Sequence, residues 1–359
     1  MTISPPAHAA ADDWTEHVFS AALGAIDILA IHLGDRLGWY RALAVTGPLT
    51  ADELAERTQT HPRYAREWLE QQATSGYLEA DGAAPTRFAL PAGAAEALTD
   101  ERSLAYISPL ARMLVGAATH MPALLDAYRT GRGVSWDQMG DDARWSQAAM
   151  NRPWFEQMLA EAIEKVPDVH ATLGRADAVV ADVACGAGWS SIALADAYPN
   201  ATIVGIDIDE PSIERARENA AEAGVSDRVT FRAGDALEVE GTYDAVFIFE
   251  ALHDMPRPVE VLEAVRRAVK PGGVVVVMDE GVGDEGLTVG DDVERLMYGF
   301  SLFVCLPDGM SSQGSAGTGT VMRPSILKGY AQDAGFEDIS VLPIEDFGFF
   351  RFYQLHQPA

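Results

Sequence analysis

The sequence predicts an α/β protein in which a doubly wound, largely parallel sheet follows an all-helical/winged-helix N-terminal domain. Three observations support this fold class. From residue 176 onward, short apolar runs of strand type alternate with helical stretches, which is the pattern of a parallel sheet covered by helices. The first strand runs into a glycine-rich turn, as is typical of ligand-binding open sheets. Near the N-terminus, two short helical patterns precede two short strands, and this order is typical of a winged helix-turn-helix.

The composition limits the classes of function. The 359 residues are 48% apolar, enough for about two domains at roughly 150 residues each. A formal net charge of −28 repels a phosphate backbone, so we expect no nucleic-acid partner. The two cysteines, Cys185 and Cys305, stand in no metal-type spacing, and no export pattern precedes them. We therefore expect both thiols to stay reduced and the protein to be cytoplasmic.

The N-terminal segments carry two separate expectations. Residues 1–13 contain two prolines and no long apolar run, so we expect a short disordered lead. The apolar run from His17 to Gly34 is interrupted by Asp27 and His32, and it lacks the ~18 uncharged apolar residues of a membrane span. We expect this run to form one or two buried helices, and we expect no membrane partner.

The helix-turn-helix pattern lies in the first domain, which we place at residues 1–110. Thr50 is expected to cap its first helix and Thr60 its second. Gly76 stands where a left-handed turn would end the second helix. Two short strands follow, and the second ends at Leu90, so a wing completes the pattern.

Two roles are open for this winged domain. Between Thr50 and Leu90 the sequence contains seven carboxylates and four arginines, and a recognition helix with that balance is poorly suited to DNA. A cofactor-binding transcription regulator is therefore the less favoured interpretation. Dimerisation together with capping of the substrate is the favoured one.

The rest of the chain divides into a helical connector, residues 111–175, and a sheet domain, residues 176–359. The expected parallel strands of the sheet domain are residues 178–184, 201–209, 228–235, 243–250 and 272–280. Ser325 can cap a helix that runs to Ala334. Two strands follow that helix with a very short link between them. The link indicates an antiparallel pair at the sheet edge, because a parallel crossover needs a dozen or more residues.

The turn after the first strand, DVACGAGWSS, carries the first chemical signal. Gly186 and Gly188 permit a tight turn and let a ligand approach the backbone, while the following helix presents free N–H groups. A dinucleotide site uses the same device, but Ser191 replaces its third glycine. A nicotinamide-dependent oxidoreductase is therefore disfavoured.

Carboxylates end three successive strands: Asp182, Asp207 and Asp235. Asp207, nineteen residues after Gly188, can accept hydrogen bonds from both hydroxyls of a ribose. Asp235 is placed to accept from an adenine amino group. Each carboxylate alone could be a solvated strand end, but together, at the edge where open sheets bind ligands, they indicate a nucleoside cofactor.

From residue 176 to the end, these motifs resemble the class I S-adenosylmethionine-dependent methyltransferases. DVACGAG resembles their glycine motif, GIDID their ribose-binding strand end, GDA their adenine-contacting motif, and KPGGVVVVMDE the turn into their fifth strand. The resemblance implies a Rossmann-like seven-stranded methyltransferase sheet with a reversed last strand. It also implies S-adenosyl-L-methionine as cofactor, S-adenosyl-L-homocysteine as product, and no metal. The implied cofactor-binding residues are Asp182, Ala184, Cys185, Gly186, Gly188, Asp207, Ile208, Asp235, Ala236 and Glu250. Ala184 departs from the family's first glycine, and since alanine is small we expect little loss of binding.

The upstream region is similar to small-molecule O-methyltransferases. The shared features are the winged domain, Asn151 at the end of the connector, and LHD after the fourth strand. The similarity implies a small-molecule methyl acceptor and a homodimer formed through the N-terminal domain. It also implies a connector helix that closes over the cofactor, with Arg152 and Trp154 near the methionine end, although Trp154 is equally compatible with a core position.

The acceptor side is expected around His253. An acceptor that is protonated at neutral pH needs a general base, and His253 stands in the place of the O-methyltransferase histidine. Asp254 either orients this imidazole or caps a helix that begins near Pro256. Glu280 is a second candidate for acid/base catalysis. A thiol or carbon acceptor remains the alternative, and a thiol would depend less on His253.

An insertion at residues 293–324 precedes the last helix. Its first part is apolar and aromatic, with Tyr298, Phe303 and Cys305 as candidate pocket residues, and residues 311–320 form a Gly/Ser/Thr-rich loop. Either the segment is a packing helix with a surface loop, or it is a pocket wall with a mobile lid.

Overall fold

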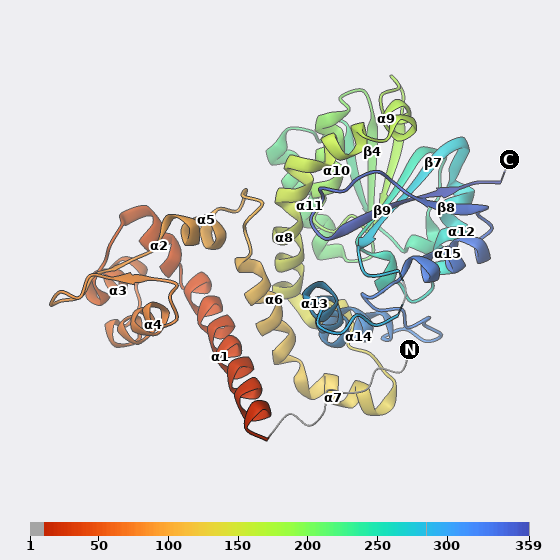
Figure 1. Ribbon diagram of the computed structural model, residues 1–359. Coiled ribbons are helices and arrows are strands. Elements are labelled where there is room, and N and C mark those ends of the chain that lie inside the picture. Colours follow the sequence, from red (N-terminus) through yellow and green to blue (C-terminus); the bar gives the residue numbers. More distant parts are fainter. Residues whose placement is uncertain (1–10, 285, 359) are drawn as a thin grey trace. The chain divides into compact units, whose positions relative to one another are not determined.

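The computed structural model describes residues 11–284 and 286–358. The chain forms two compact units, which meet along the sequence between Val115 and Gly116. The first unit contains the winged helix-turn-helix, and the second contains the sheet (Figure 1). The helices expected as a separate connector are divided between the two units, and most of them belong to the second.

The first unit consists of helices and a two-stranded wing. Its elements are α1 (Ala11–Arg36), α2 (Trp39–Thr46), α3 (Ala51–Thr58), α4 (Pro62–Thr74), β1 (Glu79–Ala80), β2 (Phe88–Ala89) and α5 (Ala92–Thr99), and α6 (Ser108–Thr119) runs across the boundary. Strands β1 and β2 pair in antiparallel fashion. The winged helix-turn-helix pattern read from the sequence is therefore confirmed.

The sequence predicted the N-cap of α3 correctly and the N-cap of α4 incorrectly. Thr50 caps α3 as expected, in a capping box with Glu53. The expectation for Thr60 is wrong, because the N-cap of α4 is His61, whose Nδ1 accepts from the backbone N–H of Arg63 at 3.2 Å. Thr60 instead accepts from the indole of Trp39 at 3.2 Å. The cap falls on His61 because Pro62 occupies the first helical position.

Helix α1 corrects two expectations. It begins at Ala11, inside the lead that was expected to be disordered, while residues 1–10 of that lead lie outside the described residues. It is also one continuous helix that is largely exposed instead of buried. Seven of its apolar side chains are between 48% and 64% exposed: Trp14, Val18, Phe19, Leu23, Ile26, Leu29 and Leu33.

The second half of α1 packs on the rest of the first unit. The indole of Trp68 donates to the carbonyl of Ala30 at 2.8 Å, and Asp27 accepts from Ser75 at 2.7 Å. By length and composition alone, α1 is also long and apolar enough to cross a membrane. These polar contacts to α4 and its C-terminal turn favour a helix that belongs to the globular unit.

The second unit is built on a seven-stranded sheet in the order β5-β4-β3-β6-β7-β9-β8. The strands are β3 (Val179–Val183), β4 (Thr202–Asp207), β5 (Val229–Ala233), β6 (Tyr243–Phe249), β7 (Val269–Glu280), β8 (Asp338–Val341) and β9 (Phe350–His356). The first five are parallel, and β9 pairs antiparallel with both β7 and β8. The predicted parallel sheet with a reversed last strand is therefore confirmed.

Helices cover both faces of this sheet (Figure 1). One face carries α8 (Trp136–Glu164), α9 (Pro167–Leu173), α10 (Trp189–Ala197) and α11 (Glu210–Ala223), and the other carries α12 (Pro258–Ala268) and α15 (Pro324–Asp333). Phe247 lies in the first core, and its neighbour Ile248 lies in the second. This alternation along β6 buries both faces of the strand.

Three local features of the second unit bear on the site. Helix α8 is interrupted at Gly140, whose φ of 71° is left-handed. The insertion forms α13 (Asp292–Phe300), a π-helical turn η3 (Ser301–Cys305) and α14 (Leu306–Gly309). The expectation that Ser325 caps the last helix is wrong, because α15 begins with Pro324 and its N-cap is Arg323. Helix α7 (Met121–Thr130) completes the unit.

Candidate active site

A cavity of about 370 Å³ lies at the carboxyl ends of β3, β4, β5 and β6. These ends meet at one edge of the sheet, where open parallel sheets bind their ligands, and the volume suits a small organic molecule. The lining side chains come from the turn after β3, the ends of β4 to β6, helix α8 and the residues around α14. The cavity therefore coincides with the strand ends at which the sequence places its motifs.

The turn between β3 and α10 forms one wall of the cavity. Its backbone takes left-handed φ values at Ala184 (60°), Gly186 (51°) and Gly188 (80°). A side chain at Gly188 would meet the ring of Phe231 at 2.6 Å, so this glycine permits close packing of helix on strand and does not line the cavity. Ala184 adopts the conformation that glycine favours, which strains it by about 1–2 kcal/mol.

Asp207, at the end of β4, fixes the same turn. One carboxylate oxygen accepts from the backbone N–H of Gly186 at 2.7 Å, and the other accepts from the N–H of Asp209 at 2.8 Å. Burial raises the pKa of this carboxyl, while the backbone hydrogen bonds oppose that rise. Asp207 lines the cavity beside Ile208, whose side chain is exposed. It can therefore present its carboxylate to hydroxyl groups of a ligand.

Asp182 lies behind the turn and does not line the cavity. It is fully buried and accepts from the hydroxyls of Ser190 and Ser191, both at 2.6 Å. Burial raises its pKa to about 6. The sequence placed Asp182 among the ligand-binding residues, but its contacts make it a support for the start of α10. The serine at position 191, where a dinucleotide site has glycine, is one of its two partners.

The end of β5 supplies a third wall. Asp235 and Ala236 line the cavity, and one oxygen of Asp235 accepts from the backbone N–H of Leu237 at 2.9 Å. The guanidinium of Arg257 lies 4.0 Å from the other oxygen. Asp235 is partly exposed, so this carboxylate is available to a ligand at the far end of the cavity from β6.

Glu250 closes the cavity at the end of β6. Its backbone is left-handed, with a φ of 51°, and one of its side-chain oxygens accepts from the amide of Asn151 at 2.5 Å. Burial raises its pKa to about 7. Cys185 also lines the cavity from the turn after β3, and its thiol is buried. Asn151 and Glu250 therefore join α8 to the sheet across this part of the cavity.

His253 lies in the short helix η2 (Leu252–Asp254), directly behind the cavity wall. Its side chain is only 2% exposed. Nδ1 lies 2.8 Å from Asp279 and 3.2 Å from Glu280, whereas Nε2 lies 3.1 Å from Asp254. Asp254 lines the cavity and His253 does not. A ligand in the cavity therefore meets the carboxylate of Asp254 before it meets the imidazole.

The carboxylates around His253 set its charge. Burial alone lowers the pKa of an imidazole, but the negative charges of Asp254, Asp279 and Glu280 outweigh burial and raise the pKa well above 6.5. Burial raises the pKa of Glu280 far above its usual value, whereas the imidazolium holds the pKa of Asp279 low despite its burial. The pKa values of Asp279 and Glu280 are therefore shifted in opposite directions.

The structure shows where Asp254 and Glu280 lie relative to the neighbouring helix and to the cavity. Asp254 does not cap a helix, because α12 begins at Pro258 and its N-cap is Arg257. Its carboxylate lies 3.1 Å from Nε2, and orientation of His253 stays a prediction. Glu280 is 3% exposed and does not line the cavity. It contacts the imidazole from behind, so the structure does not bring it to a ligand.

Several cavity residues were missed by the sequence reading. Helix α8 lines the cavity with Trp136, Arg144, Gln147, Ala148, Asn151 and Phe155. Counted from Arg144, the next four of these residues are three, four, seven and eleven positions further along the chain. This spacing places them on one face of the helix. The identification of Asn151 could therefore have led to them. Arg144 makes a bidentate contact to Asp209, with its shortest N–O distances at 2.8 Å, and so ties α8 to the end of β4.

Other predicted pocket residues lie elsewhere. Trp154 packs against Phe347 with ring centroids 5.8 Å apart, and Arg152 stacks over Trp189 at 4.1 Å, and neither lines the cavity. Tyr298 and Phe303 do not line it either, whereas the loop that was expected as a lid contributes Ser312 and Gln313. Asp308, beside that loop, accepts from the backbone N–H of Trp136 at 2.7 Å.

Comparisons with known sequences agree with this geometry. A methyltransferase-domain family model matches residues 175–295, and an Rv2258c-like winged HTH domain model matches residues 24–100. The 27-O-demethylrifamycin SV methyltransferase of Amycolatopsis mediterranei is 32% identical over 156 residues, 41% of this chain and 57% of that protein. A ubiquinone biosynthesis O-methyltransferase of Colwellia psychrerythraea is 30% identical over 210 residues, 57% of this chain and 78% of that protein. The chain therefore spans little more than half of the first of these relatives and about three quarters of the second.

Solved structures with the same fold cover nearly the whole chain. The mitomycin 7-O-methyltransferase superposes with a TM-score of 0.74 at 23% identity, over 97% of this chain and 98% of that one. An O-methyltransferase from neocarzinostatin biosynthesis, solved with S-adenosyl-L-homocysteine and 1,4-dihydroxy-2-naphthoic acid, gives a TM-score of 0.67 at 20% identity, over 92% of this chain and 96% of that one. At these identities the likeness establishes the fold.

Proposed function

The chain belongs to the S-adenosylmethionine-dependent methyltransferases, and from that premise we propose that it transfers the methyl group to a hydroxyl oxygen of a small molecule. The observation that carries this proposal is the cavity itself. It runs from Asp207, at the end of β4, to Asp254, which separates it from a buried imidazole. One end therefore has a carboxylate for a ribose, and the other has groups that can take up a proton.

The residues of the cofactor end fit S-adenosylmethionine. Ala184 and Gly186 hold a left-handed backbone turn that leaves room for a ligand, and Asp207 offers carboxylate oxygens beside it. Asp235 and Ala236 lie where an adenine would be held. When bound, the cofactor supplies an electrophilic methyl group on a positively charged sulfonium. Asn151 and Glu250 line the cavity between the two ends, where they can orient this part of the cofactor.

We assign His253 and Asp254 to removal of the acceptor's proton. Asp254 faces the cavity, and its carboxylate lies 3.1 Å from Nε2 of His253, so a proton taken from a hydroxyl can reach the imidazole through this carboxylate. The imidazole must first be neutral, although its pKa is raised by the surrounding carboxylates. A bound sulfonium opposes a second positive charge nearby and lowers that pKa.

An aromatic hydroxyl is the acceptor class that the cavity supports best. Trp136, Phe155, Trp189, Phe249 and Met255 line it with apolar surface, against which an aromatic ring can pack. The related O-methyltransferase from neocarzinostatin biosynthesis was solved with a dihydroxynaphthoic acid. Thiol and carbon acceptors are the other outcomes of the test below.

The test first measures binding of S-adenosylhomocysteine by calorimetry and then screens phenols, carboxylates and thiols with labelled cofactor. We expect micromolar binding and methyl transfer to phenols. His253→Ala should lower turnover on the phenol by ~100-fold or more while cofactor affinity stays within about twofold. Failure of the wild-type protein to bind the cofactor product contradicts the methyltransferase proposal. Turnover unchanged in His253→Ala contradicts only the role of the imidazole.

The proposal includes a homodimer formed through the first unit, in the cytoplasm, without nucleic acid or membrane. The exposed apolar stripe of α1 supports it, because seven large apolar side chains at 48–64% exposure on one helix exceed what a free surface usually carries. A second copy of the stripe would cover them in an isologous interface.

Sedimentation velocity tests this assembly. We expect the wild-type protein to sediment as a dimer, Leu23→Glu with Ile26→Glu to sediment as a monomer, and Val45→Glu to stay dimeric. Val45 is the matched control because it is an apolar residue, 88% exposed, on α2 and not on α1. A monomeric wild-type protein that co-sediments with lipid vesicles would instead favour α1 as a membrane helix.

A further inference from the structure

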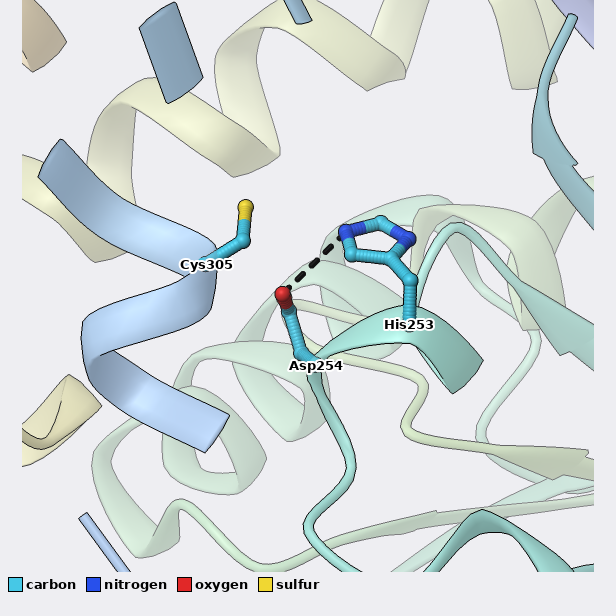
Figure 2. A group of neighbouring side chains, drawn as sticks. All are labelled: His253, Asp254 and Cys305. Carbon is cyan, nitrogen blue, oxygen red and sulfur yellow. Dashed lines mark ion pairs between the residues drawn. The ribbon is translucent and has the colours of Figure 1, made fainter. Parts of the chain in front are cut away.

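Three side chains with different donor atoms converge beside the cavity, and Asp254 is the one that lines it (Figure 2). They are the imidazole of His253, the carboxylate of Asp254 and the thiol of Cys305, and their donor atoms all lie within 4.8 Å of one another. From this constellation we infer a binding site for one Zn²⁺ ion, with Nε2, a carboxylate oxygen and Sγ as its ligands. The inference goes beyond methyl transfer and contradicts the expectation, drawn from the sequence, that no metal is bound.

The separations suit a tetrahedral site. Zinc binds thiolate at about 2.3 Å and imidazole or carboxylate at about 2.0–2.2 Å, so tetrahedral ligand atoms lie roughly 3.5 Å apart. Nε2 and the Asp254 oxygen are 3.1 Å apart, and the thiol is within 4.8 Å of both. The thiol would have to move closer by side-chain rotation to complete the geometry. Among the described residues three side chains form this group, so a fourth position would stay open, as in catalytic zinc sites.

The far side of the imidazole is arranged as metal-binding histidines require. Nδ1 lies 2.8 Å from Oδ1 of Asp279, and the same oxygen accepts the backbone N–H of Glu280 at 3.1 Å. Because Oδ1 is an acceptor, Nδ1 carries the hydrogen and donates it. This contact fixes the ring and directs Nε2 toward Asp254 and Cys305. Zinc binding would release the protons of Nε2 and of the Cys305 thiol to solvent.

Two further observations bear on this group. Oδ1 of Asp254 is buried and pairs with Nε2 of His253 at 3.1 Å without a well-formed hydrogen bond to a described residue, so an ion bound to this oxygen would replace no such bond. Cys305 belongs to the π-helical turn η3, a rare form that is frequent at functional sites. That turn brings the thiol to the imidazole from a segment 52 residues away in sequence, as the numbers 253 and 305 show.

The donor set selects the ion. Thiolate and imidazole are ligands of zinc and of other borderline or soft metals, whereas Mg²⁺ and Ca²⁺ prefer oxygen ligands only. His253, Asp279 and Glu280 form a second close group on the Nδ1 side. That group is not the site we infer, because its nitrogen donates to Asp279 and it contains no sulfur.

Zinc on Nε2 has a consequence that rests on the proposed function. The lone pair that would bind zinc is the one that would accept the acceptor's proton, and it cannot do both. Occupancy should therefore inhibit methyl transfer to oxygen, and a chelator should restore it. Binding of zinc itself does not depend on whether the chain methylates anything, so the two proposals can fail separately.

The test titrates the chelator-treated full-length protein with Zn²⁺ by calorimetry and, in parallel, with Co²⁺ by absorption spectroscopy. We expect one ion per chain, and we expect the near-ultraviolet charge-transfer band of a cobalt–thiolate bond. Cys305→Ser and His253→Ala each remove a ligand, so each should weaken zinc binding by more than the ~10–100-fold that loss of an outer-shell partner costs. Cys185→Ser, the other cysteine of the chain, should bind zinc as the wild-type protein does and keep the cobalt band.

Three results overturn the inference. One is the absence of stoichiometric zinc binding to the wild-type protein, and another is a cobalt complex without the thiolate band. The third is a Cys305→Ser variant that binds zinc like the wild-type protein while its thermal melting and its S-adenosylhomocysteine affinity show it to be folded. If that variant does not fold, the cobalt spectrum of the wild-type protein still decides, because the band can come only from Cys185 or Cys305 and the Cys185→Ser control separates them.

Discussion

The carboxylates at one end of the cavity and those at and behind its other end have opposite surroundings. At the ends of β4 and β5, Asp207 and Asp235 line the cavity and are held by backbone N–H groups at 2.7–2.9 Å. At the ends of β6 and β7, Asp254, Asp279 and Glu280 surround one imidazole. Each of these three carboxylates has an oxygen without a hydrogen bond to any described residue.

The difference separates holding a ligand from managing charge. Backbone N–H groups hold a carboxylate in place and favour its ionised form, so the β4 and β5 ends form a rigid acceptor of hydrogen bonds. Three carboxylates instead surround one imidazole at the β6 and β7 ends, and they raise its pKa while the pKa of Glu280 is also raised. Substitutions in the first half should therefore change affinity for the cofactor, and those in the second should change pH dependence.

The largest effect is expected for Asp207→Ala. The variant loses the carboxylate that a ribose would meet and the hydrogen bonds that hold the turn at Gly186. At ~1.5–3 kcal/mol for each hydrogen bond to a charged group, S-adenosylhomocysteine affinity should fall by ~100-fold or more. Calorimetry measures it, with Asp227→Ala as a surface control. If Asp207→Ala bound S-adenosylhomocysteine as tightly as the wild-type protein, the carboxylates at the ends of β4 and β5 would not be the ones that hold the cofactor.

The dependence of kcat/KM on pH tests the role of the carboxylates around His253. A neutral imidazole is required, and its pKa is raised above 6.5, so kcat/KM for the acceptor should rise as pH increases through that pKa. Asp254→Asn removes one of the charges that raise it, so the rising limb should move to lower pH by ~1 unit. Cofactor affinity should stay unchanged. A profile that moves to higher pH, or that does not move, contradicts the assignment of Asp254.

The loop beside α14 should have a smaller effect, confined to the acceptor. Removal of Ser311–Gly319 takes away Ser312 and Gln313 from the cavity wall. We expect a ~10-fold higher acceptor KM with cofactor affinity within about twofold, as for a loop that covers only one substrate. Steady-state kinetics and calorimetry together measure this split. Equal loss for both ligands would show that the loop supports the whole cavity, and the lid hypothesis would fail.

The smallest effect is expected for Ala184→Gly. This residue has a φ of 60°, and glycine removes the strain at some cost in chain entropy, so the free energy of unfolding should rise by ~0.5–1 kcal/mol. Urea unfolding measures the change. Ala187→Gly, in the same turn without a positive φ, should lower stability instead. A destabilised Ala184→Gly would mean that the turn carries no strain to relieve.

The cofactor half could be predicted from the sequence because its parts are local. A strand, a glycine turn and a strand-end carboxylate lie within about thirty residues of one another, and each has a recognisable pattern. Asp182 shows the limit of such patterns. It belongs to the motif, but its carboxylate accepts hydrogen bonds from Ser190 and Ser191. The spacing of a motif does not distinguish a carboxylate that faces a ligand from one that faces the core.

The acceptor half could be predicted only in part. His253 was identified by position, but its burial depends on Asp279 and on the insertion that carries Cys305, segments that the sequence does not bring together. The prediction that helix α1 is buried was wrong for another reason. An apolar pattern predicts that one face of a helix is buried. It does not show whether the same chain or a second molecule buries that face. The misplaced caps at Thr60 and Ser325 follow from prolines that fix where the helices begin.

The break at Gly140 has a consequence for the order of events during turnover. Beyond the break, α8 is anchored to the cofactor end through Arg144 and Asp209, whereas its first turn is anchored beside the acceptor end through Trp136 and Asp308. Because the left-handed glycine separates the two anchors, we expect that one can release without the other. Under the proposed function, acceptor and methylated product would then exchange while the cofactor end stays closed. This favours a compulsory sequence in which the cofactor enters first and its demethylated form leaves last.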